Sequence, residues 1–292
     1  MKIAVVEPSS AAPEEELLSG LAVLHRLTGE PLPLPLSKTP TLFLAGTDRE
    51  RFLELKEALE DPAVEAVVAV RGGAGAQRLL PHLSRIRPRG QKILVGSSDL
   101  TYLGLALWKR FGIPFCHGPM LTRLARPDFT RVEGAHLKRA LSRKCLDYAA
   151  PRGVWAVRPG RSEGTLLGGN LTLFASLLGT KHLPSLGRAI LLLEDVNEPL
   201  YRLDRLLQTL RQAGVLDRAA GVVFGRMEGC FAPSGPKGWR ALLGEYFADA
   251  PYPVLAGFPS GHGKPQYPLW IGGRARLDAS RRTLRSFFPE RA

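Results

Sequence analysis

Two strand-turn-helix segments in this 292-residue chain carry residues that could do chemistry. The first is the Gly-Ser-Ser-Asp turn at 96–99, between the apolar run Lys92–Val95 and a segment of helical periodicity at Asp99–Phe111. A strand that turns sharply into a helix exposes a hydroxyl beside the helix N-terminus, as a nucleophile elbow does. Serine at such a turn is also typical of a plain helix N-cap. The segment alone leaves both interpretations open.

The second segment is a glycine loop, Arg71-Gly-Gly-Ala-Gly-Ala, after the apolar run Ala66–Val70. Glycines allow a close backbone approach and leave amides free to bind an anion. Arg78 stands where a dinucleotide fingerprint needs its third glycine, and no Gly-Lys-Ser/Thr follows, so a Walker loop is excluded. An oxyanion loop, a phosphate loop and a tight turn all remain open.

An acid and a histidine lie in two later loops. Glu194, Asp195 and Glu198 follow the apolar strand Ala189–Leu193, and His262 stands in the glycine-rich stretch 257–263. Serine, acid and histidine are the parts of a hydrolytic triad.

The other histidines are weaker candidates for the base. His117 and His182 are placed in loops, whereas His25, His82 and His136 fall in segments of helical pattern. No two histidines have metal-ligand spacing, which disfavours metal catalysis. We expect no cofactor.

The candidate loops connect strands and helices that alternate along the chain. The first half predicts strands at 3–6, 42–44, 66–70 and 92–95, with helices at 14–27, 48–59, 77–83 and 99–111 between or after them. Such alternation predicts a parallel sheet with its ligands at the carboxyl ends of the strands. We expect a flavodoxin-like α/β domain over 1–145, a Pro- and Gly-rich connector at 146–165, and a smaller mixed α/β or barrel-like domain over 166–292.

Composition bounds the class of protein. Hydrophobic residues make up 45% and charged residues 23%, which are globular values. No apolar run is long enough for a membrane helix, and three scattered cysteines suit reduced thiols. We therefore expect a soluble, cytoplasmic protein. The net charge of +13 raises a second class, a nucleotide or nucleic-acid binder, but the arginines are scattered and no nucleic-acid-binding motif accompanies them.

Taken together, these segments resemble the LD-carboxypeptidase family, which includes murein tetrapeptide carboxypeptidases and microcin C immunity peptidases. The resemblance runs nearly end to end. It rests on the segments 7–10, 45–51, 71–75, 96–101, 117–120, 168–171, 178–180, 193–196, 201–205 and 257–262 in this order.

The resemblance implies a serine peptidase whose two domains together supply the triad. Ser98 matches the family nucleophile, Glu194 the acid and His262 the base. The amides of Gly73 and Asp99 would form the oxyanion hole, and Asn170 would contact the substrate. It also implies release of a terminal D-alanine from murein tetrapeptides, a homodimer, and no metal. The microcin-type amidases, which act on peptidyl or aminoacyl nucleotides, are the alternative.

The sequence departs from the family pattern at Ala74 and Ser97, where aromatic residues are usual, and at Gln266 and Trp270. We expect these changes to affect the substrate pocket or its loops. A carboxypeptidase must also bind a free carboxylate, for which arginine is well suited. Arg71, beside the glycine loop, is the first candidate, with a structural role as the alternative.

Overall fold

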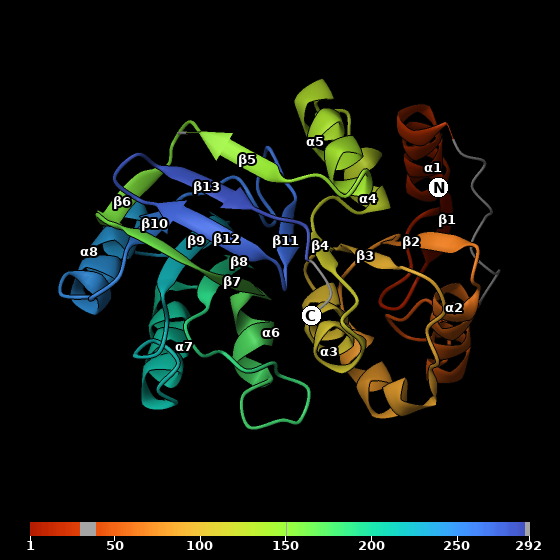
Figure 1. Ribbon diagram of the computed structural model, residues 1–292, viewed down its shortest axis with the longest axis horizontal. Coiled ribbons are helices and arrows are strands. Elements are labelled where there is room, and N and C mark those ends of the chain that lie inside the picture. Colours follow the sequence, from red (N-terminus) through yellow and green to blue (C-terminus); the bar gives the residue numbers. More distant parts are fainter. Residues whose placement is uncertain (30–38, 150, 290–292) are drawn as a thin grey trace.

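The computed structural model describes residues 1–29, 39–149 and 151–289, which form two β-sheets with their own helices (Figure 1). The first sheet has the order β1–β2–β3–β4–β11, in which β1 to β4 are parallel and β11 is antiparallel to β4. Its strands are β1 (Lys2–Val6), β2 (Val64–Ala69), β3 (Ile93–Gly96), β4 (Phe115–His117) and β11 (Leu269–Ile271). The predicted parallel N-terminal sheet is confirmed.

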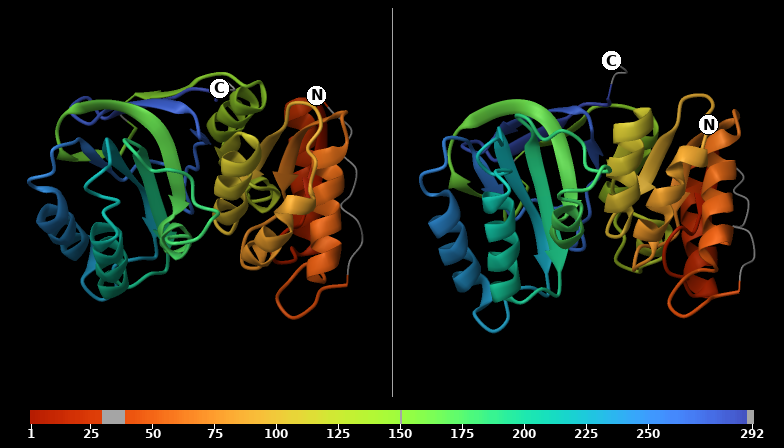
Figure 2. Two further views of the ribbon diagram at one scale, coloured as in Figure 1. Left: turned by 60° about the horizontal axis from the view of Figure 1, so that its bottom comes forward. Right: turned by 90° about the horizontal axis from the view of Figure 1, so that it is seen from below.

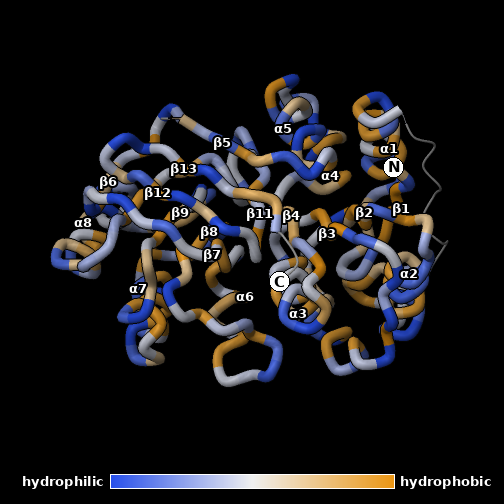
Figure 3. Tube along the Cα trace, in the orientation of Figure 1, coloured by the Kyte–Doolittle hydropathy of each residue, from blue (hydrophilic) through white to orange (hydrophobic). Residues whose placement is uncertain are grey.

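Helices pack around this sheet in two groups. They are α1 (Glu14–Thr28), α2 (Asp48–Glu60), the 3₁₀ helix η1 (Ala76–Arg85), α3 (Leu100–Phe111), α4 (Leu121–Leu124) and α5 (Arg131–Leu141). Helix α1 contacts α4 and α5, whereas η1 contacts α2 and α3. The strands β1 to β3 are mostly apolar, as Figure 3 shows, and are buried between the helices. No helix in the three described ranges is long and apolar enough to cross a membrane.

The strand predicted at 42–44 is wrong. Thr41 and Leu44 instead close a tight turn through two reciprocal backbone hydrogen bonds of 3.0 Å. Leu42 within the turn has a φ of 57° and an exposed side chain. A left-handed residue interrupts the extended backbone that a strand needs.

The second sheet has the order β5–β13–β12–β7–β8–β9–β10–β6, in which β7 to β10 are parallel and the other pairs antiparallel. Its strands are β5 (Leu146–Ala149), β6 (Trp155–Arg158), β7 (Arg161–Asn170), β8 (Ile190–Val196), β9 (Gly221–Glu228), β10 (Val254–Ala256), β12 (Arg274–Asp278) and β13 (Thr283–Ser286). Segment 146–165, expected to be a connector, thus contributes two whole strands and half of a third.

The helices that accompany the second sheet are α6 (Leu171–Ser176), α7 (Leu200–Gln212) and α8 (Gly235–Phe247). Helices α7 and α8 lie side by side next to the parallel strands (Figure 2). The mixed α/β character predicted for this half is confirmed.

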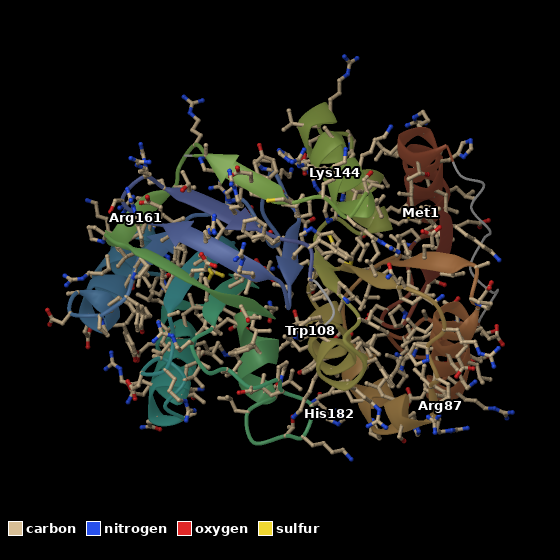
Figure 4. The ribbon with its side chains drawn as sticks, viewed as in Figure 1. Met1, Arg87, Trp108, Lys144, Arg161 and His182 are labelled. Atoms are coloured by element: carbon tan, nitrogen blue, oxygen red, sulfur yellow. The ribbon has the colours of Figure 1, made fainter. Side chains whose placement is uncertain are left out.

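The two sheets are interlocked at their junction. Strand β11 comes late in the chain but pairs with β4, so the first sheet is completed by the C-terminal half. Trp108 of α3, at the junction in Figure 4, packs on Gly272 directly after β11, where an added Cβ would lie 2.4 Å from the indole. Tyr102 of α3 also bonds Ser176 of α6, with 2.7 Å between the oxygens.

Gly104 tests this packing, because a Cβ there would lie 2.2 Å from the Phe115 ring in β4. Alanine normally stabilises a helix over glycine by up to about 1 kcal/mol. We expect Gly104→Ala nevertheless to destabilise the protein by about 1–3 kcal/mol, the usual cost of overpacking. The matched control is Gly244→Ala in α8, where no heavy atom lies within 4 Å and a gain is expected. Urea unfolding measures both, and stabilisation by Gly104→Ala would contradict this packing.

Candidate active site

Ser98 lies in a strained turn at the carboxyl end of β3. Its φ is +56°, a value uncommon outside glycine, and its side chain is half-buried. Neither serine acts as a side-chain helix cap: α3 has no side-chain cap, and the Ser97 hydroxyl accepts a bond from Gln266 Nε2 at 3.1 Å. The turn therefore has the backbone of a nucleophile elbow rather than that of an ordinary N-cap.

The glycine loop lies directly against this turn. A Cβ on Gly72 would stand 2.8 Å from Cβ and 3.1 Å from Oγ of Ser98, so only glycine fits. Asp99 Oδ2 accepts a 2.7 Å bond from the Ala76 amide and ties the loop to the turn. Burial raises the pKa of Asp99, and this amide bond opposes the increase.

The predicted oxyanion-hole amides are available. Within the described ranges, neither the Gly73 nor the Asp99 amide donates a hydrogen bond. Gly73 has a φ of +98°, which glycine adopts readily. Two free amides beside a half-buried hydroxyl can bind a developing oxyanion.

A fully buried arginine braces the loops around this turn. Arg51 of α2 donates to the carbonyl oxygens of Pro8, Gly46 (3.3 Å) and Gly75 (3.1 Å). Asp48 pairs with the same guanidinium at 2.5 Å. Sequence reasoning included Arg51 in a motif but gave it no role, because its three carbonyl partners are backbone groups that carry no residue signature.

Glu194 and His262 form a direct pair in the second half of the chain. Nδ1 of His262 lies 2.7 Å from Oε2 of Glu194, which is fully buried in β8. Gly261 permits this approach, because a Cβ there would lie 2.5 Å from Oε2. The structure thus brings together two of the three residues assigned from the resemblance.

The pair perturbs both groups. Burial alone would raise the pKa of Glu194, but the charge and hydrogen bond of His262 and the nearby His117 imidazole lower it to about 2. Burial alone would lower the pKa of His262, but the Glu194 carboxylate raises it above its usual value. An ionised acid therefore faces an imidazole of increased basicity.

His117 is a site residue that sequence reasoning missed. It was placed in a loop, yet it is the last residue of β4 and fully buried. Its Nε2 lies 3.5 Å from Oε1 of Glu194, in charge-contact range but short of a well-aligned hydrogen bond. His117 was missed because the Gly-Pro after it indicates a turn and because its acidic partner, Glu194, is distant in the sequence.

A cavity of about 670 Å³ adjoins this pair. Its lining includes Ser97, Gln266 and His262, together with Arg123, Arg126 and Lys264. Within the described ranges the Ser98 hydroxyl makes no hydrogen bond, so its contact with His262 is not formed in this structure. Ser97, next to Ser98, and His262 nevertheless line the same cavity.

Two other predicted residues are engaged elsewhere. Arg71 is exposed and donates to the carbonyl of Ala11 at 3.1 Å, outside the cavity lining. Asn170 is buried and caps α6 through Leu173, while its Nδ2 donates to Asp195 at 2.8 Å.

Of the four departures from the family pattern, Ser97 and Gln266 border the cavity. Ala74 is exposed on the glycine loop, and its amide donates to Ser10. Trp270 is buried in β11 against Phe288 and lies outside this cavity lining.

Comparison with known proteins covers both halves of the chain. The family model described as LD-carboxypeptidase N-terminal domain matches residues 3–118, and the LD-carboxypeptidase C-terminal domain matches residues 163–277. A Streptomyces coelicolor protein, named only provisionally as a carboxypeptidase, is 38% identical over 97% of this chain and 92% of its own length. The murein tetrapeptide carboxypeptidase of Pseudomonas aeruginosa is 33% identical over 82% and 80%.

Solved structures agree with the sequence relatives. The muramoyltetrapeptide carboxypeptidase from Oxalobacter formigenes has a TM-score of 0.85 and 28% identity, covering 99% of this chain and 100% of that one. The microcin C7 self-immunity protein shares the fold, with a TM-score of 0.88 at 21% identity over 100% and 97% of the two chains. The chain belongs to the LD-carboxypeptidase family.

Proposed function

We propose that this carboxypeptidase uses Ser98, His262 and Glu194 to release the C-terminal D-alanine of murein tetrapeptides. The observation that carries the proposal is the 2.7 Å pair of buried Glu194 and half-buried His262, because His262 lines the same cavity as Ser97, the residue next to Ser98. The substrate class is the one named for the Pseudomonas and Oxalobacter relatives.

In the proposed reaction each group takes the role that it has in a serine triad. Nε2 of neutral His262 takes the Ser98 proton as Oγ attacks the peptide carbonyl, while Glu194 holds Nδ1–H and stabilises the imidazolium. The Gly73 and Asp99 amides bind the oxyanion. The imidazolium protonates the leaving amine of D-alanine, and water then attacks the acyl-enzyme with His262 again as base.

Arg126 is the best candidate to bind the terminal carboxylate. Arg123 in the same cavity already bonds Glu133 and Asp128, and Lys264 bonds Asp128 as well. The Lys264 and Arg123 bonds lower the pKa of Asp128 to about 2. Within the described ranges the Arg126 guanidinium has only a 3.9 Å contact to Glu16, and its side chain is 60% exposed. It therefore replaces Arg71 in this proposed role.

The proposed assembly rests on the family resemblance, and the proposed location on composition and the scattered cysteines. We propose a homodimer in the cytoplasm with no nucleic-acid partner. Several surface arginines are neutralised by acids on the second sheet, as in the Arg276–Glu163 pair at 2.8 Å and the Arg161–Asp278 pair at 2.6 Å. These acids lie among the arginines of the sheet surface, which argues against an all-basic phosphate-binding surface there.

We expect Ser98→Ala to lower turnover by about 10⁴–10⁶-fold, the scale for loss of a triad nucleophile. Ser97→Ala is the matched control, since it removes the neighbouring hydroxyl and should have a much smaller effect. Mass-spectrometric quantification of D-alanine released from murein tetrapeptide measures both. Equal losses from two folded variants would mean that Ser98 is not the nucleophile.

The proposed base also predicts a pH dependence. His262 must be neutral, so kcat/KM should fall as pH drops through its pKa, with a midpoint above the usual value of about 6.5. In Glu194→Gln the charge that raises this pKa is gone and burial remains, so the pKa should decrease. Imidazole NMR titration of both proteins checks this, and an unchanged His262 pKa would remove Glu194 from the pair.

Carboxylate recognition is tested with an acid and an amide substrate. We expect Arg126→Gln to lower kcat/KM about tenfold on the free acid, equivalent to about 1.4 kcal/mol. On the C-terminally amidated tetrapeptide, which has no such charge, the variant should match the wild type. Arg71→Gln is the control. If the wild type cleaves the amide as fast as the acid, the amidase alternative is favoured.

A further inference from the structure

His117 connects the strand of the nucleophile to the proposed acid. In the first sheet it is paired in register with Gly96, two residues before Ser98. In the part of the chain that the structure describes, the two imidazole nitrogens contact residues of the second half: Nδ1 lies 3.3 Å from the Ser260 hydroxyl and Nε2 lies 3.5 Å from Oε1 of Glu194. One side chain thus spans the junction of the two sheets at the site.

The Ser260 contact sets the orientation of the ring. The serine hydroxyl can donate to Nδ1, which leaves the proton of a neutral imidazole on Nε2, facing Glu194. Ser260 is itself fixed, because its carbonyl accepts the Arg226 amide at 2.8 Å and its own amide donates to Phe258 at 2.8 Å. The Phe115 ring, edge-on at 5.9 Å, limits rotation of the imidazole.

The Glu194 carboxylate needs this contact. Its Oε2 is held by His262, but its Oε1 is buried and has no hydrogen bond within the described ranges. His117 Nε2 is likewise buried without another partner there. A buried carboxylate oxygen without a donor is costly, so the imidazole N–H is the group that favours one orientation of the carboxylate.

We propose that His117 is a positioning residue that fixes Glu194, and through it His262, relative to the nucleophile turn. The proposal rests on the triad proposed above. His117 touches neither the substrate nor the reacting atoms. Its effect is to keep Oε2 aimed at Nδ1 of His262, which defines the tautomer and direction of the base.

A matched pair of variants separates this role from simple packing. In His117→Gln the amide nitrogen can occupy the place of Nε2 and donate to Glu194, whereas in His117→Asn the shorter amide reaches only the Nδ1 side. We expect His117→Asn to lower kcat about 10–100-fold with KM within about twofold, as loss of a buried partner implies. The kcat of His117→Gln should be at least about tenfold higher than that of His117→Asn.

A spectroscopic readout reports the geometry directly. The proton shared by His262 and Glu194 should give a far-downfield ¹H resonance in the wild type and in His117→Gln. It should shift or broaden in His117→Asn. Equal losses of kcat in the two variants, or an unchanged resonance in His117→Asn, would reduce His117 to a packing residue.

Two further variants keep the test decisive. If His117→Asn does not fold, Ser260→Ala replaces it, because it removes the group that orients the ring; we expect kcat about three- to tenfold lower with KM unchanged, and an unaltered kcat would overturn the proposal. Full activity of Ser98→Ala would instead refute the triad itself, independently of His117.

Discussion

The site depends on one buried negative charge. Glu194 is fully buried, and within the described ranges its only ionic contacts are two imidazoles, His262 at 2.7 Å and His117 at 3.5 Å. The low dielectric around it makes each contact strong and the loss of either costly. The end of β4 in the first sheet, the end of β8 in the second sheet and the loop after β10 must therefore meet at this one carboxylate.

Small residues make that convergence sterically possible. Gly261 and Gly225 leave room for the Glu194 side chain, and Gly72 leaves room for Ser98. Polar side chains then fix the neighbouring loops through hydrogen bonds to the backbone. Asp99 accepts from the first amide of η1, and Arg51 donates to carbonyl oxygens in three loops. These surrounding contacts thus stabilise the strained backbone conformation of Ser98.

The sequence could predict the local parts of this arrangement but not all of its long-range contacts. The strand-turn-helix at Ser98 and the glycine loop follow from neighbouring residues, whereas the choice of Glu194 over Asp195 and Glu198 came from family resemblance. His117 was missed because its partners lie 77 and 143 positions away. Asn170 and Arg71 were assigned to the substrate from motif and position, and their bonds to Asp195 and Ala11 are tertiary contacts that no spacing encodes.

The pairing of β11 with β4 has a consequence for biosynthesis. Strand β4, which carries His117, is an unpaired edge until residues 269–271 have been made, because its other neighbour is β3. A nascent chain that has completed β1 to β4 exposes that edge to other strands. The edge stays open, and the proposed hydrolytic centre cannot assemble, until the segment from His262 to β11 has left the ribosome.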